Sequence, residues 1–429
     1  MSHSHHLGVL CMAISVSLGA AGAEERPDEK GWRQFRGPQR DGRSDETGLL
    51  KEWPTDGPPL AWRIDGLGKG YSSLAISQDK IFTMGDRKKA EFVIAVDRLT
   101  HKESWATSIS EEWKDGGPRC TPTVDGDRVY AIGAHGDLVC LAVKTGDVIW
   151  RKSLAKDFGG KMMSGWGYSE SPLVDGNKLL CTPGGADAAI VALDKQSGQL
   201  LWKTRLPNLG SRGRDGAGYA SMVVSEACGI RQYVQTLGRG TVGVAADDGR
   251  FLWGYNRSAN DTANISMPVV TGDFVFCTTS YKTGSALLKL VPAKDKAGIE
   301  AKEVYTLGAS EFENHHGGLV LVDGYIYGGH GQNNGAPACI ELKTGKIMWK
   351  DRGPGDGSAA VIYADGNLYF RYQNGLMALI EATPKELKVK STFKLPTKGG
   401  PSWPHPVILG GMLYLRHEDA LLCYDIRQK

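Results

Sequence analysis

The sequence predicts an all-β fold, an eight-bladed β-propeller of four-stranded antiparallel blades closed by an N-terminal strand. The first observation is an aromatic repeat, because a large ring ends one segment of short alternating strands after another at intervals of 43 to 52 residues. The second is the glycine content, 57 residues, many in Asp-Gly pairs that favour tight turns between strands. The third is a lone strand before the first unit. The recurring rings are Trp62, Trp105, Trp150, Trp202, Trp253, Tyr305, Trp349 and Phe393.

The clearest repeat unit covers residues 120–154. Its first strand ends at the Asp125-Gly126 turn, a second strand follows, and a longer loop leads to a third strand that ends at a Thr-Gly turn. A fourth strand then ends in Trp150. This order predicts one four-stranded antiparallel blade for each repeat. The predicted blades cover residues 71–109, 120–154, 170–206, 219–257, 265–307, 315–352, 356–395 and 402–429.

The last unit has only three strands, and the missing one lies at the other end of the chain. Residues 59–64 form an isolated strand whose Trp62 stands one repeat before Trp105. Pairing this strand with the last blade closes the ring and leaves no open sheet edge between the first and last blades. We therefore expect one propeller domain, residues 59–429, in which strand 59–64 completes the last blade.

Two segments precede the propeller. The short apolar stretch Leu7–Ala20 is followed by Ala21-Gly22-Ala23, which has the form of a signal-peptidase site, so residues 1–23 are predicted to be a signal peptide. The protein is then exported, either periplasmic or secreted. Residues 24–58 contain Trp32 and Phe35 and are predicted to be an ordered strap laid on the propeller, because a flexible linker seldom contains such rings. No later segment reaches the ~20 apolar residues of a transmembrane segment.

The net charge and the positions of the cysteines argue against some kinds of partner and cofactor. The 51 basic and 48 acidic residues give a net charge of +3 and form no basic stripe, which argues against a nucleic-acid partner. Cys140, Cys339 and Cys423 occupy the same strand position in three repeats, as Cys181 and Cys277 do in two others. Equivalent positions in different blades lie far apart, so these cysteines are predicted to be buried core residues. There is no Cys-Cys dipeptide and no Cys-x-x-Cys-His haem motif.

The segments that end in tryptophan carry a family resemblance. Residues 192–202 read Ala-Leu-Asp-Lys-Gln-Ser-Gly-Gln-Leu-Leu-Trp, and residues 95–105 match the same pattern except that His101 replaces the glycine. This pattern resembles the tryptophan docking motif of the PQQ-like, or quinoprotein-type, β-propeller repeats of exported bacterial proteins. The resemblance covers residues 59–429 and implies the fold. The repeats are also similar to those of the propeller lipoproteins of the outer-membrane β-barrel assembly machinery.

Candidate binding residues gather on one face of the predicted disc. The Asp-Gly and Thr-Gly turns share one face, and the longer second-to-third-strand loops and the links between blades share the other, where functional residues are usual. Aromatic rings there suit stacking, arginine suits an anionic group, and histidine or glutamate suits proton transfer or a metal. The alternative is that these side chains only cap strand ends or fill the channel. The predicted ligand-binding residues are Arg119, His135, Trp166, Tyr168, Glu170, Asn264, His315, His316, His330, Arg371, Trp403 and His405.

A metal site among the histidines has a geometric difficulty. His315 and His316 with His330 could supply imidazoles, but adjacent side chains on a strand point to opposite faces, so only one of the first two is expected to face the channel. The sequence assigns neither metal ligands nor catalytic residues.

Three functions fit these observations. The first is a ligand- or partner-binding scaffold that takes a small molecule, a glycan or a protein at the channel mouth. The second, implied by the resemblance, is a quinoprotein-type dehydrogenase oxidising an alcohol or sugar with PQQ and calcium, in which Glu170, Asn264 and Asp215 would serve as calcium ligands and base. No Cys-Cys or other enzyme motif supports PQQ or calcium here. The third is hydrolysis or lyase chemistry on a polysaccharide.

Overall fold

The computed structural model describes residue 1 and residues 31–77, 79–293, 298–396 and 399–428. Apart from Met1, the predicted signal peptide lies outside the described residues, as do residues 24–30 of the predicted strap. The chain divides into two units, Met1–Lys30 and Gly31–Lys429, and the second contains all of the secondary structure described below.

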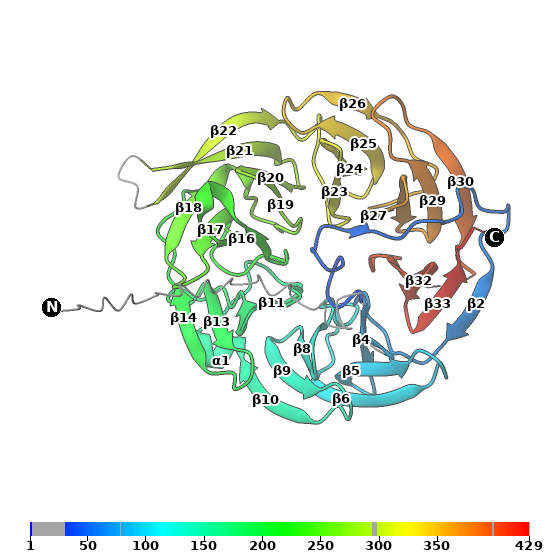
Figure 1. The fold of residues 1–429 in the computed structure, drawn as a ribbon, viewed down its shortest axis with the longest axis horizontal. Helices are drawn as coiled ribbons and strands as arrows, with labels where there is room; N and C mark the ends of the chain where they lie inside the picture. Colours follow the sequence, from blue (N-terminus) through cyan, green and yellow to red (C-terminus); the bar gives the residue numbers. More distant parts are fainter. Residues whose placement is uncertain (2–30, 78, 294–297, 397–398, 429) are drawn as a thin grey trace. The chain divides into compact units, whose positions relative to one another are not determined.

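Eight sheets follow one another around a central axis, as predicted (Figure 1). In six of them, blades 1 to 6, the strands lie in sequence order and neighbours are antiparallel. The blades are blade 1, β3 (Ala75–Ser77), β4 (Lys80–Arg87), β5 (Ala90–Asp97) and β6 (Glu103–Glu111); blade 2, β7 (Thr123–Asp125), β8 (Arg128–Ile132), β9 (Asp137–Ala142) and β10 (Val148–Ser153); blade 3, β11 (Leu173–Asp175), β12 (Lys178–Cys181), β13 (Ile190–Asp194) and β14 (Leu200–Thr204); and blade 4, β15 (Val223–Ser225), β16 (Gln232–Leu237), β17 (Gly240–Ala245) and β18 (Phe251–Tyr255).

The second half of the ring repeats this arrangement. Its blades are blade 5, β19 (Val269–Thr271), β20 (Phe274–Thr279), β21 (Gly284–Pro292) and β22 (Ile299–Leu307); blade 6, β23 (Leu319–Val322), β24 (Tyr325–His330), β25 (Ala336–Glu341) and β26 (Ile347–Lys350); blade 7, β27 (Ala359–Ala364), β28 (Asn367–Tyr372), β29 (Leu376–Glu381) and β30 (Val389–Lys394); and blade 8, β31 (Val407–Leu409), β32 (Met412–His417), β33 (Ala420–Asp425) and β2 (Leu60–Ile64). The α-helix in the described residues is one short turn, α1 (Leu154–Phe158).

Strand β2 closes the ring. It pairs antiparallel with β33, with Trp62 opposite Cys423 and Ile64 opposite Leu421, and so supplies the outer strand that the last blade lacks. The predicted closure by residues 59–64 is confirmed. A β-bulge lies between Leu60 and Trp62, at the position where the outer strands of blades 2 and 3 also have one.

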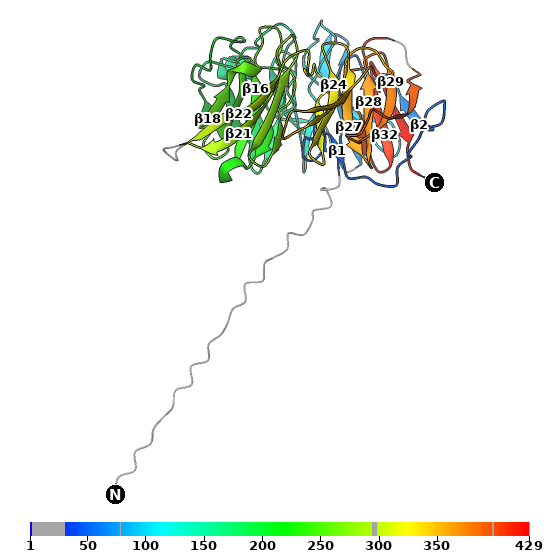
Figure 2. The ribbon, with the colours of Figure 1, turned by 90° about the horizontal axis from the view of Figure 1, so that it is seen from above.

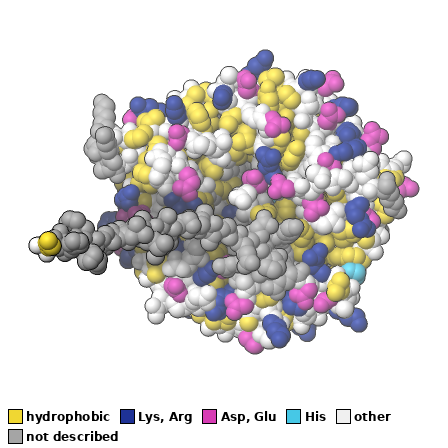
Figure 3. Space-filling model, viewed as in Figure 1, with side chains coloured by type: hydrophobic (Ala, Val, Ile, Leu, Met, Phe, Trp, Pro, Cys, Tyr) yellow, Lys and Arg dark blue, Asp and Glu magenta, His cyan; other side chains and the backbone are white. Residues whose placement is uncertain are grey.

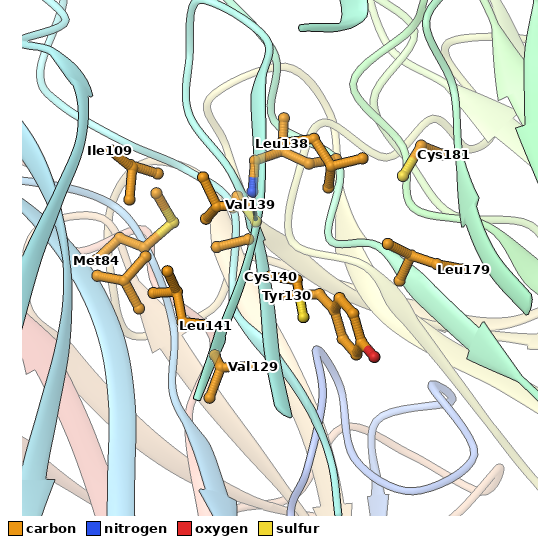
Figure 4. Close-up of a cluster of buried hydrophobic side chains, with 14 of the residues drawn as sticks. Met84, Ile109, Val129, Tyr130, Leu138, Val139, Cys140, Leu141, Leu179 and Cys181 are labelled. Carbon is orange, nitrogen blue, oxygen red and sulfur yellow. Dashed lines mark hydrogen bonds between the residues drawn. The ribbon is translucent and has the colours of Figure 1, made fainter. Parts of the chain in front are cut away.

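The core lies between the blades. Side chains from both faces of the middle strands are buried, whereas the outer strands expose part of theirs, as β9 and β10 show. In the cluster around blade 2, Met84 and Ile109 of blade 1 and Leu179 and Cys181 of blade 3 pack near Val129, Tyr130 and Leu138–Leu141 (Figure 4). Cys140, Cys181, Cys277, Cys339 and Cys423 are buried free thiols, as predicted; Cys120 is buried too, and Cys228 is half-buried.

The described part of the strap, residues 31–58, lies on the face of the tight turns. The Trp32 carbonyl accepts from the Ile76 amide at 2.8 Å, the Arg33 carbonyl from the Val124 amide at 2.8 Å, and the Leu50 amide donates to the Ile426 carbonyl at 2.7 Å. One strand was not predicted. This strand, β1 (Arg43–Ser44), pairs parallel with β27 and becomes the fifth, innermost strand of blade 7. In the edge-on view, β1 lies near the lower flat face of the disc (Figure 2).

The strap face carries charges of both signs. Lysine and arginine side chains alternate with aspartate and glutamate over the visible surface, and no single-sign stripe crosses it (Figure 3). This distribution agrees with the near balance of 51 basic and 48 acidic residues.

Candidate functional site

A cavity of about 280 Å³ lies on the propeller axis. Its wall is built mainly by the links that lead from one blade into the first strand of the next. Tyr281 of the β20–β21 loop and two residues of the strap also contribute. The lining residues are Phe35, Arg36, Tyr71, Asp115, Arg119, Trp166, Ser169, Ser171, Tyr219, Ser221, Ala263, Ile265, Ser266, Met267, Tyr281, His315, His316, Gly318, Trp403 and His405.

The strap forms the floor of this cavity. Phe35 packs against the apolar cluster of blades 4 and 5, while the guanidinium of Arg36 reaches the other side of the axis and donates to the carbonyls of Leu319 in blade 6 and Val361 in blade 7. Arg36 is 3% exposed, and its φ of 63° is a left-handed conformation that turns the chain across the channel. Because the strap crosses the axis, the cavity opens toward the loop face alone.

Aromatic rings stand on two sides of the cavity. Tyr71 of the blade 1 link and Trp403 of the blade 8 link pack with ring centroids 4.6 Å apart. Trp166 and Tyr219, from the links into blades 3 and 4, meet edge to face at 5.9 Å. Trp166 is 37% exposed at the mouth, so this ring offers surface to a ligand.

Arg119 is fixed at the mouth by backbone carbonyls. Its Nη1 donates to the Trp166 carbonyl at 3.1 Å and its Nη2 to the Asp115 carbonyl at 2.8 Å, and the guanidinium lies 5.5 Å from the centre of the Tyr71 ring. Burial lowers the pKa of Arg119, an effect that Asp115 opposes. Since arginine titrates far above neutrality, the side chain stays charged.

Three imidazoles line the cavity in their neutral form. Burial lowers the pKa of His315 to about 4 and that of His405 to about 3, where the charge of Arg36 adds to the effect, and it holds the pKa of His316 well below its usual value. Arg36 Nη1 donates to His405 Nδ1 at 3.1 Å, so His405 carries its proton on Nε2, which lies 3.3 Å from the His316 carbonyl. His315 is held between Ser358 and Tyr281 at 2.8 and 3.0 Å.

The expectation that only one of His315 and His316 faces the channel is wrong. Both line the cavity, with ring centroids 4.4 Å apart. The alternation rule does not apply, because these two residues lie outside any strand. His330 stands apart, with its Nδ1 accepting from the Glu313 amide at 3.3 Å, and no group of three His, Cys, Asp or Glu side chains within the described ranges is arranged to hold a metal ion.

Of the twelve predicted ligand-binding residues, the structure brings six together at the cavity: Arg119, Trp166, His315, His316, Trp403 and His405. The other six lie elsewhere. Two of them lie away from the cavity: His135, in a second-to-third-strand loop, packs edge to face on Trp113, and His330 is the last residue of β24.

The remaining four are buried in the blades and hydrogen-bonded there. Tyr168 donates to the Pro183 carbonyl at 2.9 Å, and Asn264 donates to the carbonyls of Leu237 and Gly238 at 3.0 Å. Arg371 is fully buried and donates to Ser402 and to the Pro404 carbonyl. Glu170 accepts from both the amide and the hydroxyl of Thr182, at 2.7 and 2.8 Å, and burial raises its pKa to about 7.

Sequence reasoning missed the floor residues Phe35 and Arg36 and the wall residues Tyr71, Tyr219 and Tyr281. It also missed a ring of hydroxyls around the axis, in which Thr121 accepts from the Ser73 amide at 3.1 Å, Ser171 from the Thr121 amide at 2.9 Å, and Ser221 from the Ser171 amide at 2.9 Å. Each of these hydroxyls accepts a hydrogen bond from the backbone of the preceding link and so connects one blade to the next. Their spacing of 48 to 50 residues, each two positions before a first strand, was a usable signal in the sequence.

Comparison with known proteins agrees with this architecture. The PQQ-like repeat model described as outer membrane protein assembly factor BamB matches residues 89–351. The chain belongs to this family of PQQ-like β-propellers. Two relatives of the same description are from Alteromonas naphthalenivorans, 26% identical over 286 residues, and Pseudomonas aeruginosa, 30% identical over 78 residues. These matches cover 64% and 18% of this chain, and 64% and 20% of the respective relatives, so the chain matches less than two thirds of either relative's length.

Solved structures share the fold at low sequence identity. BamB from Moraxella catarrhalis superposes with a TM-score of 0.60 at 13% identity, covering 86% of this chain and 99% of that one. A quinohemoprotein alcohol dehydrogenase from Comamonas testosteroni superposes with a TM-score of 0.63 at 12% identity, covering 93% and 81%. At such identities the likeness speaks for the propeller and leaves its chemistry open.

The described residues do not fit a calcium-bound quinone cofactor. Calcium takes six to eight oxygen ligands, several of them carboxylates. Asp115 supplies the carboxylate on the cavity wall, while Glu170 and Asn264 point into the blades and are engaged by Thr182 and by backbone carbonyls. Asp215 pairs with Arg239 at 2.8 Å outside the cavity lining.

Proposed function

We propose that this chain is an exported binding propeller whose ligand site is the central cavity on the loop face. The observation that supports this most is the combination of a closed floor, aromatic walls and a few polar groups in one concave site, which is the usual form of a small-molecule site. The six predicted residues at the cavity act in this proposal as binding residues. In the described residues, no helix is long and apolar enough to span a membrane.

A thermal-shift screen of the purified protein against a chemically diverse panel of small molecules tests this proposal. We expect at least one compound to raise the melting temperature, since a ligand that binds the folded state alone stabilises it by mass action. Trp166→Ala should remove that shift, because it deletes the exposed ring at the mouth. Val148→Ala is the control, since Val148 is 45% exposed on the outer strand β10. A shift that persists unchanged in Trp166→Ala would place the ligand elsewhere.

A protein partner at the same face is the second candidate, favoured by the description of the curated relatives as outer-membrane assembly factors. It predicts that the rim residue Arg119, and not the buried His405, governs binding. For the dehydrogenase alternative, the donor set above leads us to expect no dye reduction when PQQ and calcium are added over a panel of alcohols and sugars. Saturable turnover in that assay would replace the binding proposal.

A further inference from the structure

We propose that the central cavity is an end-on subsite for an uncharged terminal sugar ring of a glycan. This inference rests on the proposed function, because it specifies what the same cavity takes. Four features of the site lead to it: the closed floor, the occupied cationic groups, the open neutral groups and the aromatic walls.

The closed floor admits only the end of a chain. Phe35 and Arg36 cross the axis beneath the cavity, and Arg36 is held by carbonyls of blades 6 and 7 and by Asp41 of the strap itself. A side chain on Gly318 or Gly42 would collide with the Arg36 guanidinium, so the floor is closely packed around this residue. A polymer therefore cannot thread through the disc, and a ligand larger than the cavity must present a terminus.

The cationic groups at the cavity have little capacity left for an anion. Both terminal nitrogens of Arg119 donate to backbone carbonyls, and both terminal nitrogens of Arg36 are taken up by carbonyls and by His405. The three imidazoles are neutral. Asp115, 61% exposed at the mouth, adds a negative charge. An anionic ligand would therefore gain few charge-assisted hydrogen bonds, which are the strong ones.

The groups that remain open are neutral and can both donate and accept. The Tyr71 hydroxyl makes no hydrogen bond to the described residues, and Ser169 Oγ makes only a long one, 3.4 Å to the Gly167 carbonyl. The His316 ring lines the cavity, and its buried Nε2 has no partner in the described part of the chain. Hydroxyl groups of a ligand match such sites, because a hydroxyl also donates once and accepts twice.

The walls and the size suit one ring. Tyr71 with Trp403, and Trp166 with Tyr219, provide flat apolar surfaces for the carbon-bound hydrogens of a sugar. A volume of about 280 Å³ lies at the small end of ligand pockets, which hold drug-sized molecules from about 300 Å³ upward. One terminal ring would fill the cavity, and the next unit would lie at the rim beside Trp166 and Asp115.

Isothermal titration calorimetry of the purified protein tests this proposal. The probes are glucose, galactose, mannose and N-acetylglucosamine, their β-1,4 or α-1,4 disaccharides, glucuronate as a charged counterpart, and benzoate as an aromatic anion. We expect at least one neutral sugar to bind more tightly than glucuronate and benzoate. If the preferred sugar is glucose, maltose should bind and β-cyclodextrin, which has the same linkage and no chain end, should not.

Three variants, Tyr71→Phe, Trp403→Ala and His316→Gln, locate the binding, and His135→Ala is a control. Tyr71→Phe removes only a hydroxyl without a protein partner and should weaken sugar affinity about threefold to tenfold, the usual effect of one neutral hydrogen bond. Trp403→Ala should weaken it about tenfold or more by removing a stacking surface. His135→Ala is the matched control for His316→Gln, because His135 is a loop histidine outside the cavity, and it should leave affinity unchanged.

The outcomes separate this inference from the proposed function. Binding of benzoate or glucuronate in preference to neutral sugars, lost in Trp403→Ala, would overturn the sugar assignment and leave the cavity as the ligand site. Cyclodextrin binding as tight as maltose would overturn the end-on geometry. Sugar binding that is unchanged in Tyr71→Phe, His316→Gln and Trp403→Ala would overturn both the sugar assignment and the cavity as its site. The thermal-shift screen remains the separate check on whether any small molecule binds.

Discussion

The turn glycines and the repeated tryptophans form one structural device. At the Thr-Gly and Ser-Gly turns between third and fourth strands, the glycine lies against the large ring of the preceding blade. A Cβ on Gly146 would lie 2.6 Å from Trp105, and one on Gly198 would lie 2.9 Å from Trp150. The same rings donate across the blade boundary, Trp105 Nε1 to the Val143 carbonyl at 3.0 Å and Trp150 Nε1 to the Lys195 carbonyl at 3.2 Å. The motif therefore docks one blade on the next and is not part of the ligand site.

Exceptions to the motif keep the contact by other means. In blade 1, His101 takes the glycine's place, adopts a φ of 57°, and stacks on Trp62 with ring centroids 4.5 Å apart. Tyr305 replaces a tryptophan, and its hydroxyl donates to the Leu342 carbonyl at 2.8 Å. The contact between a ring and the turn of the next blade is thus retained where the residues differ from the motif.

Gly198→Ala should destabilise the protein more than Gly176→Ala. Both glycines have left-handed backbone, with φ of 72° and 60°, so alanine at either costs about 1 to 2 kcal/mol in conformation. An added Cβ meets nothing within 4 Å at Gly176, whereas at Gly198 it meets the Trp150 ring. Overpacking should cost Gly198→Ala at least ~1 kcal/mol more. Urea denaturation curves of the two variants measure the difference, and equal midpoints would contradict the docking role.

At the scale of the element, the long hairpin β4–β5 contains a pair of carboxyl groups. Asp86 and Glu91 face each other across the hairpin, and Glu91 is fully buried, with Oε2 accepting from the Ala134 amide of blade 2 at 2.9 Å. Burial raises the pKa of Glu91 to about 8 and that of Asp86 to about 6. Both groups therefore bind protons more tightly in the folded than in the unfolded protein.

This pair should make the protein less stable as pH rises. A raised carboxyl pKa stabilises the fold fully below the unfolded value of 4.5 for Glu91, and that contribution is lost as pH climbs through about 8. The melting temperature should therefore fall between about pH 6.5 and 8.5, because below this range the lowered pKa values of His315, His330 and His405 oppose the effect. Glu91→Gln should flatten this decline and leave the smaller part due to Glu170, whose pKa burial raises to about 7. A Glu91→Gln profile parallel to that of the parent would argue against a protonated Glu91.

The strands were predictable from the sequence because their signals are local and repeated. Asp-Gly turns, alternating burial and a ring at the end of each fourth strand locate all eight blades, and Trp62 identifies the closing strand. The site was only half predictable, because residues in the links alternate in direction. Ser169 and Ser171 line the cavity, while Glu170 between them points into the blade. In the same way, Ala263 and Ile265 line the cavity, while Asn264 between them points into the blade. The sequence alone does not specify which of the two alternating sets of residues faces the axis.

The floor of the site was beyond sequence reasoning for a different reason. Phe35 and Arg36 reach the cavity only because the strap crosses the axis, and its contacts join residues separated by 283 to 369 positions in the chain. Local patterns carry no information on such contacts. The same long range explains why the pairing of β1 with β27 was not foreseen.

At the scale of the whole molecule, the ring depends on β2 more than on the strap. Strand β2 supplies the outer edge of blade 8, and without it β33 would present unpaired backbone groups along its length. The strap buries Trp32, Leu49 and Trp53 on blades that are already complete. Removing the strap should therefore weaken a closed ring, whereas removing β2 as well should open it.

Two shortened chains test this distinction. A chain that begins at residue 59 keeps β2, and we expect it to unfold in one cooperative transition at a lower melting temperature than the parent. A chain that begins at residue 66 lacks β2 and should show a broader transition and concentration-dependent association, because an exposed strand edge pairs with other chains. Calorimetry and sedimentation velocity measure the two properties. If the chain from residue 66 stays monomeric with the melting profile of the chain from residue 59, closure by β2 contributes little to the integrity of the ring.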